Sequence, residues 1–502
     1  MLAKLKRSLL LMTMTLLVML WNILFAQGNG NNLAFQGLYD ETENGVKALA
    51  MGGAYIAHSG DINSIYYNPA GLADIDKFQL SFSYANKGYL THEYQRWTNH
   101  RGVNGAVELL LRGNYNFDPQ YNWVRSDSII YEEDRWLGPK TGVGYYEKDD
   151  ADWVYDNNRN GLNFVVGFPF KVGSTKISLA GAYVDKNNII DYDRNDTYLT
   201  PQTNLYSVQI KLPDGRTSVV PFEWFQYERE RTGELKSIMG AASIKLNNNL
   251  SFGVCVNTIS GDTEDRLGLD KVGDVSLDPP IELSAYRFKY DTLNTSIEGT
   301  SKFSGTKFDL GTLISFDHIS FGARVSLPST IERSYKYVVT QSTANGSSSQ
   351  DSTGVDKLGL PVTYGFGLNI RPVNRLALAF DLQMNPYSHN EWETAGCDTN
   401  ANEWVDQTIL RFGIEYKLTD YMSLLGGYRQ IPLAFASQGQ EFKDSGEIGE
   451  SITVGVNIKI LSGWLDIAYE SRDTKYVDWY GWNRNYVRQR QNTFLVGYTL
   501  VL

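Results

Sequence analysis

The sequence lacks several features that would mark other protein classes. After residue 26 no apolar run approaches the ~20 residues that a membrane-spanning helix needs, and the mean hydropathy is −0.33. A helical membrane protein is therefore excluded, whereas a soluble secreted protein and a β-barrel both remain. The only two cysteines in 502 residues, Cys255 and Cys397, are too few for a disulfide framework. We expect two free thiols.

Basic residues and histidines are also scarce. The chain has 46 Lys and Arg against 57 Asp and Glu, a poor composition for binding nucleic acid, whose phosphates require cations. No two of the five histidines have metal-ligand spacing on one strand, and the sequence contains no nucleophile elbow. We therefore expect no enzyme, no catalytic residues, no cofactor and no metal site.

The first 26 residues have the pattern of a secretory signal. Lys4, Lys6 and Arg7 precede an apolar run that ends at Ala26, where a small residue permits cleavage. An uncleaved anchor helix is the alternative, which we do not favour because residues 27–32 (QGNGNN) are typical of a flexible mature N-terminus. Cleavage would leave 43 basic and 57 acidic residues, a net charge of −14.

From residue 78 onward, strands of alternating polarity are predicted. Side chains of a strand alternate between two faces, and in residues 375–384 every second residue from Leu376 to Met384 is apolar, whereas Ala379 and Asp381 lie on the other face. An apolar outer face and a small or polar inner face are typical of membrane barrels. The fourteen predicted strands are residues 78–86, 162–170, 175–185, 236–246, 249–258, 305–316, 319–327, 360–370, 375–384, 408–418, 421–430, 447–460, 463–470 and 492–502.

The connections between these strands alternate between two lengths. Short turns are predicted at 171–174, 247–248, 317–318, 372–374, 419–420 and 461–462, and long polar segments at 87–161, 186–235, 259–304, 328–359, 385–407, 431–446 and 471–491. Outer-membrane barrels have short periplasmic turns and long external loops. We therefore predict an all-β fold, a 14-stranded antiparallel transmembrane barrel in the outer membrane of a Gram-negative bacterium. Its last strand resembles the C-terminal signal read by barrel-insertion machinery.

A stretch rich in small residues precedes the first strand. It contains ALAMGGAY at 48–55, then Asp61, then Tyr67-Asn68-Pro69-Ala70. This order resembles the N-terminal hatch of the FadL-type outer-membrane transporters of long-chain fatty acids and other hydrophobic compounds. The resemblance implies a signal peptide at 1–26, a luminal hatch or plug at 27–77 and a barrel at 78–502. It also implies passive uptake of hydrophobic or amphipathic small molecules.

Two other functions stay open. The same opening resembles PorV-type barrels, which serve as accessory or shuttle proteins in type IX secretion, and secretion-system proteins would then be partners. Alternatively, external loops could bind glycans. The expected surroundings in every case are outer-membrane lipids and lipopolysaccharide, and for the transporter a hydrophobic ligand.

The resemblance implies that Asn68, Pro69 and Ala70, with Gly52 and Gly53, belong to a hatch that shifts during passage; the alternative is a turn that leads into the first strand. Charged residues on the predicted luminal face could tether the plug or meet a carboxylate head group. We favour an ion-pair network that stabilises wall and plug, because buried charges need partners. These residues are Arg324, Asp381, Arg411, Glu415, Asp466 and Glu470.

Two external segments have unusual compositions. Residues 398–403 alternate oxygen-bearing side chains as calcium loops do, but lack their glycine and late glutamate, so solvated surface is favoured. The first long segment combines aromatic rings with acids, which fits a landing surface for a solute, a sugar or a protein, or a self-packed loop at the membrane rim. Its rings are Tyr115, Phe117, Tyr121, Trp123, Tyr131, Trp136, Tyr145, Tyr146, Trp153 and Tyr155.

Overall fold

A computed structural model describes residues 44–96, 151–185, 191–195, 202–203, 222–277, 286–343, 345–393, 404–434, 447–480 and 483–502. The predicted signal, residues 27–43, Cys397 and the 398–403 run lie outside the described residues. So do the aromatic residues of the first external segment, apart from Trp153 and Tyr155, whose backbone belongs to the strand Ala151–Val172.

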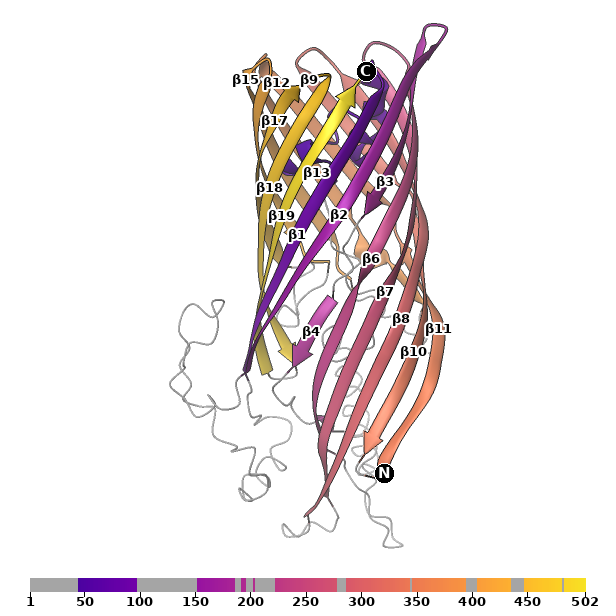
Figure 1. The fold of residues 1–502 in the computed structure, drawn as a ribbon, viewed down its shortest axis with the longest axis vertical. Helices are drawn as coiled ribbons and strands as arrows, with labels where there is room; N and C mark the ends of the chain where they lie inside the picture. Colours follow the sequence, from indigo (N-terminus) through magenta and orange to yellow (C-terminus); the bar gives the residue numbers. More distant parts are fainter. Residues whose placement is uncertain are drawn as a thin grey trace, which may run out of the picture.

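The described chain forms one closed antiparallel barrel (Figure 1). Its strand segments are β1 (Gln79–Arg96), β2 (Ala151–Val172), β3 (Thr175–Asp185), β4 (Asp191–Asn195), β5 (Gln202–Thr203), β6 (Phe222–Lys245), β7 (Leu250–Leu277), β8 (Tyr286–Ser315), β9 (Ile319–Ser326), β10 (Ser329–Thr343), β11 (Gly346–Leu360), β12 (Thr363–Val373), β13 (Leu376–Asn385), β14 (Glu391–Glu393), β15 (Gln407–Thr419), β16 (Met422–Pro432), β17 (Ile448–Ile460), β18 (Gly463–Tyr480) and β19 (Asn483–Val501).

These segments make fourteen wall strands, because β3–β5, β9–β10, β11–β12 and β13–β14 each follow one another along a single wall strand. The barrel closes where β1 pairs with β19, in register from Gln79 opposite Val501 to Arg96 opposite Arg484. The predicted fold class is confirmed. The end that carries the short turns is the periplasmic end of such barrels.

The outer surface is apolar across the middle of the wall. Large exposed side chains stand on the outer face of nearly every strand, including Phe82, Phe164, Val254, Leu310, Phe366, Phe380, Ile452 and Phe494. Toward the external side, outward tyrosines hydrogen-bond to polar side chains: Tyr84 to Asn160 (2.7 Å) and Tyr428 to Glu450 (2.8 Å). Amphipathic rings of this kind mark the boundary between lipid and water. None of the helices in the described part of the chain has the length and apolar character needed to cross a bilayer.

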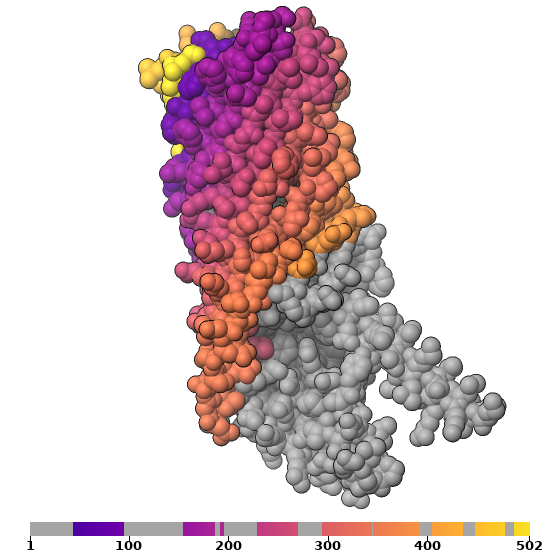
Figure 2. Space-filling view, turned by 90° about the vertical axis from the view of Figure 1, so that its right-hand side faces the viewer, coloured from indigo at the N-terminus to yellow at the C-terminus, as the bar shows by residue number. Residues whose placement is uncertain are grey.

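The prediction of long external loops is wrong over much of five segments. Residues 87–96 and 151–161 continue β1 and β2, 191–195 and 222–235 belong to β4 and β6, 259–277 and 286–304 continue β7 and β8, 329–343 and 346–359 form β10 and β11, and 471–480 and 483–491 belong to β18 and β19. These extensions stand outside the apolar belt, where outward residues such as Arg266 and Glu298 pair across strands (3.7 Å). The backbone pairing continues after the apolar alternation has ended. The extended wall reaches well beyond the rest of the barrel (Figure 2).

Prolines interrupt three neighbouring wall strands at a similar height. Pro328 lies between β9 and β10, Pro361 between β11 and β12, and Pro386 between β13 and β14. The registers show that these gaps adjoin, since Ser326 pairs with Thr363 on one side of the interruption and Ser329 with Leu360 on the other. Proline cannot donate a ladder hydrogen bond. The wall is therefore less completely hydrogen-bonded here.

Candidate functional site: the plugged lumen

Residues 44–77, called the plug below, lie inside the barrel near its periplasmic end (Figure 1). They contain α2 (Val46–Ala50), α3 (Ser64–Tyr67) and the 3-10 helix η1 (Pro69–Asp74). Their apolar side chains are almost fully buried against small luminal residues of the wall, and this contact forms the main hydrophobic core. The core of this protein is thus the interface between plug and barrel.

The predicted hatch residues shape the turns of the plug. Gly52 and Gly53 have φ angles of 66° and 79°, a region that glycine enters without strain, and the N–H of Gly53 donates to the Ala48 carbonyl (2.8 Å). Asn68 precedes η1, and its side-chain oxygen accepts from the N–H of Ala70 (3.1 Å), with Pro69 at the first helical position. This is an N-cap of the usual kind.

Polar side chains fix the plug to both sides of the wall. One carboxylate oxygen of Asp381 accepts from the backbone N–H groups of Tyr55 (2.6 Å) and Ile56 (2.8 Å). The Thr453 hydroxyl accepts from Gly52 N–H (3.0 Å) and donates to a plug carbonyl (3.1 Å). The Asn68 amide donates to the carbonyls of Ile56 (2.8 Å) and Thr312 (3.0 Å). These bonds satisfy backbone groups that burial would otherwise leave unpaired.

Luminal glycines let the plug backbone touch the wall. A Cβ added at Gly427 would lie 2.2 Å from the Gly52 nitrogen, and one at Gly253 would lie 2.3 Å from the carbonyl carbon of Pro69. Such distances leave no room for any side chain. Close approaches to plug backbone occur also at Gly322, Gly367 and Gly413, and close approaches to plug side chains occur at Gly167, Gly311, Gly455 and Gly497. The plug therefore fits the lumen without a gap along most of its circumference.

The six predicted luminal charges lie on the inner face and have varied partners. Glu415 forms an ion pair with Lys47 of the plug (3.1 Å), and Arg324 pairs with Asp309 (3.0 Å) and also donates to a plug carbonyl (3.3 Å). The remaining partners are Arg429 and Ser451 for Glu470, Asn457 for Asp466, Gln383 for Arg411, and the plug backbone for Asp381. Three of the six thus contact the plug directly.

A second set of buried charges lies on the external side of the plug and was not predicted. Asp265 accepts from Arg231 (2.8 Å), Ser301 (2.5 Å) and Tyr337 (2.6 Å), and Arg333, whose guanidinium also donates to Tyr337 (3.0 Å), pairs with Asp356 (2.7 Å). These residues come from β6, β7, β8, β10 and β11. The missed signal is their period of two, which continues the luminal face of each strand into segments that had been interpreted as loops.

Apolar luminal residues lie between these charges and the plug. Leu235, Phe303, Ile331, Leu358 and Trp404 pack together, with Tyr387 and Leu360 at their edge. Ile331, Leu360 and Tyr387 flank the prolines that interrupt the wall. The apolar lining of the lumen is thus next to the least hydrogen-bonded part of the wall.

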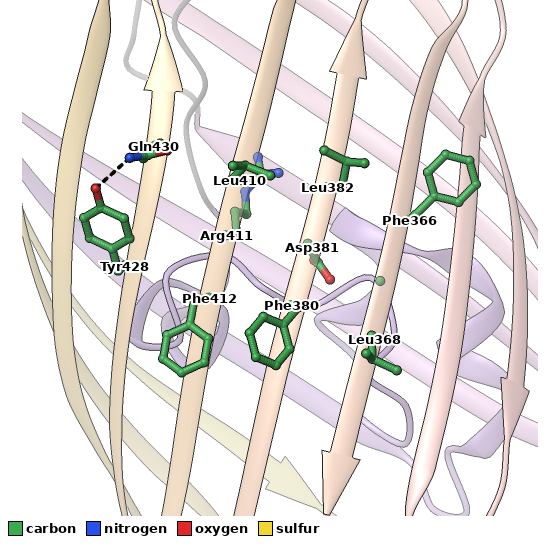
Figure 3. A pocket seen from close by; sticks show the side chains of 11 residues that line it. Phe366, Leu368, Phe380, Asp381, Leu382, Leu410, Arg411, Phe412, Tyr428 and Gln430 are labelled. Carbon is green, nitrogen blue, oxygen red and sulfur yellow. Dashed lines mark hydrogen bonds between the residues drawn. The ribbon is translucent and has the colours of Figure 1, made fainter.

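Two hollows border the plug region. An outer groove of about 500 Å³ lies between lipid-facing rings such as Phe366, Phe380, Phe412 and Tyr428, while Asp381 and Arg411 of the same strands point inward (Figure 3). A second hollow of about 490 Å³ opens at the periplasmic mouth beneath Lys47, His58 and Asp61. Burial, followed by the charge of Lys47, lowers the pKa of His58 to about 4. No His, Cys, Asp and Glu grouping suited to a metal ion occurs among the described residues.

No protein-family model and no curated protein matches this chain. Several solved structures of other proteins do match this chain. A FadL homologue from Pseudomonas aeruginosa is 11% identical, with a TM-score of 0.56, and covers 92% of this chain and 99% of its own. The P. putida toluene transporter TodX is 12% identical (TM-score 0.52; 92% and 99% covered), and the monoaromatic hydrocarbon channel CymD is also 12% identical (TM-score 0.51; 91% and 97% covered).

These likenesses extend over the whole barrel at identities that reflect shared architecture. The apolar outer face, the closed fourteen-stranded wall and the structural neighbours all belong to outer-membrane barrels, and the outer membrane is where this chain resides. The protein has the fold of the FadL-type outer-membrane transporters.

Proposed function

We propose that the barrel takes up hydrophobic or amphipathic small molecules, such as long-chain fatty acids, through the outer membrane, and that the plug controls their passage. The observation that carries this proposal is the order of features along the lumen. The charged cluster around Asp265 lies outermost, followed by apolar lining around Phe303 and Trp404 and then by the closely fitted plug. A small solute that reaches the apolar lining is stopped by the plug.

Two exits are compatible with this order. A shift of the plug would open the periplasmic mouth, and separation of the wall at Pro328 and Pro361 would open a path to the membrane beside the apolar lining. At the second exit, Leu327 and Pro328 face Pro361 and Val362 outside the strand pairing. The first requires loss of the bonds that Asp381, Thr453 and Asn68 make to the plug.

Uptake of labelled fatty acid by cells that lack their own transporter tests the proposal. Wild-type protein is compared with the N68A/P69A variant, whose plug lacks the Asn68 cap and its bonds to Ile56 and Thr312, at matched surface levels. We expect wild-type protein to restore uptake and the variant to change the rate. If wild-type protein sits folded in the membrane without supporting uptake of fatty acid or toluene, the proposal is wrong. Stable co-purification with a secretion complex would then favour the PorV-like alternative.

A further inference from the structure

The hollow at the periplasmic mouth differs from the rest of the lumen in its charge arrangement. It measures about 490 Å³ and is bounded by the underside of the plug and by the periplasmic ends of β1, β12, β13 and β15–β19. Acids predominate at its floor and bases at its rim. Glu415 and Asp466 lie at its floor with Asp61 of the plug, whereas Arg371, Arg375 and Lys417 stand at the rim, on or beside the short turns.

The acids of the floor already have donors. Glu415 is paired with Lys47 (3.1 Å), and Asp466 accepts from the Asn457 amide (2.6 Å). Asp61 accepts from the Tyr55 hydroxyl (2.6 Å) and from the backbone N–H of Asn63 (2.8 Å). The Lys47 charge therefore belongs to the fixed structure of the plug, and the floor offers little to a further cation.

The bases of the rim have no such partners. The side chains of Arg371, Arg375 and Lys417 are exposed, and none makes a hydrogen bond or an ion pair to another described residue. Arg371 continues the luminal face of Gly365, Gly367 and Asn369 and thus points into the mouth rather than toward lipid. Asp420 is the remaining acid of the rim, so three cations face one anion. Ala377, Trp464 and Val501, which lie on the luminal face of their strands, line the same hollow with apolar surface.

We propose that this hollow is an anion-binding site that holds the carboxylate of an amphipathic solute as it leaves the barrel. The proposal rests on the uptake function proposed above and names its substrate class. Two guanidinium groups and an ammonium are the donors that carboxylates prefer, and arginine forms paired hydrogen bonds with them. Ala377, Trp464 and Val501 would contact the chain next to the head group. A solute without a charge, such as toluene, gains nothing from the three cations.

Direct binding tests the site without requiring transport. Labelled octanoate and labelled octanol are titrated into the purified full-length protein in phosphatidylcholine nanodiscs. The R371Q/R375Q variant is compared with K77Q/K171Q, a variant with the same loss of charge in which both lysines lie at the periplasmic end but outside this hollow. We expect R371Q/R375Q to bind octanoate about tenfold more weakly, R371K/R375K to bind it with an affinity between that of R371Q/R375Q and wild type because charge without the paired hydrogen bonds remains, and K77Q/K171Q to bind it as wild type does. Equal losses in both glutamine variants, or none, would overturn the site.

Phospholipid phosphate is the competing source of the same chemistry. Binding of octanoate that persists in phosphatidylcholine nanodiscs and disappears in phosphatidylglycerol nanodiscs would assign the site to lipid and overturn the proposal for a solute. Uptake into proteoliposomes separates the site from the proposed function. We expect R371Q/R375Q to lower the ratio of octanoate to octanol uptake about tenfold. If wild-type protein binds octanoate through the arginines yet takes up neither compound, the site stands and the uptake function fails.

Discussion

A single methyl group on the luminal face should loosen the plug. In the G427A variant the added Cβ would lie 2.2 Å from the Gly52 nitrogen and 2.4 Å from the carbonyl carbon of Met51, both of them backbone atoms. Neither can rotate away as a side chain would. Because an ordinary contact begins at 3.4 Å, the plug must retreat from the wall by about 1.2 Å, the difference between 3.4 and 2.2 Å.

That retreat carries a cost that can be worked out from the contacts. Thr453 holds Gly52 N–H at 3.0 Å and the Ala50 carbonyl at 3.1 Å, and both bonds break when the gap widens by this amount. Each lost bond costs about 0.5–1.5 kcal/mol, and overpacking costs about 1–3 kcal/mol. The plug should therefore lose about 2–6 kcal/mol of docking free energy.

Amide hydrogen exchange of residues 48–56 in the reconstituted barrel measures this loss. At the lower limit the exchange rates rise about 30-fold, since every 1.4 kcal/mol is a factor of ten. G426A is the matched control: its Cβ would be on the outer face, 3.4 Å from the Ile414 side chain and 3.9 Å from the Thr453 carbonyl oxygen. Plug amides that stay equally protected in G427A and G426A would refute the idea that the glycine contact holds the plug.

Three further outcomes are expected. D381N removes the charge from the acceptor of two plug amides and should weaken docking by about 1–3 kcal/mol, seen as faster exchange at Tyr55 and Ile56. D265N leaves the buried Arg231 without its anion and should destabilise the folded barrel by about 3–5 kcal/mol in denaturant unfolding, without changing plug exchange. His58 is faced by Lys47, Asp61, Glu415 and Arg371, and its pKa is about 4 in the docked plug against 6.5 when it is free. The neutral imidazole therefore contributes its full share of the docking free energy above pH 6.5, and this share is lost as the pH falls toward 4. In the H58Q variant, amide exchange of the plug should no longer depend on pH in this range.

The membrane-spanning part of the wall was predictable because each strand carries its own signal. In β13 the alternation of Leu378 and Phe380 with Ala379 and Asp381 identifies both faces without any partner. The external extensions were not predictable in this way. Outside the lipid the outer face of a strand is polar, so in β10 the inward Ile331 and Tyr337 alternate with the outward Glu332 and Lys336, the reverse of the membrane pattern.

The residue types at the turns of the plug made the plug recognisable in the sequence. The contacts that attach the plug to the wall could not be predicted in the same way. Asn68, Gly52 and Gly53 stand where a cap and turns demand those residue types. The glycines they touch lie hundreds of positions away, and nothing in the sequence near Gly427 or Gly253 indicates that a backbone lies against it. Likewise the alternation of residues in its strand places Asp381 on the luminal face. The two backbone amides that donate to it could not be predicted, because their position depends on how the plug folds.

The attachments of the plug divide it into two halves. Residues 46–57 form the first half and contact β9, β12, β13 and β15–β19, where Asp381, Glu415 and Thr453 lie. Residues 60–76 form the second half and contact β1–β3 and β6–β9. Expelling the whole plug would break both sets of contacts at once, while movement of one half breaks only its own.

Asn68 joins the halves, because its amide binds Ile56 of the first half and Thr312 of the wall that holds the second. The mouth hollow lies beneath residues 58–61, where the halves meet. A passage that opens there needs the first half to lift and the second to stay, so the Asn68 amide must release the Ile56 carbonyl and Asp61 must release the Tyr55 hydroxyl.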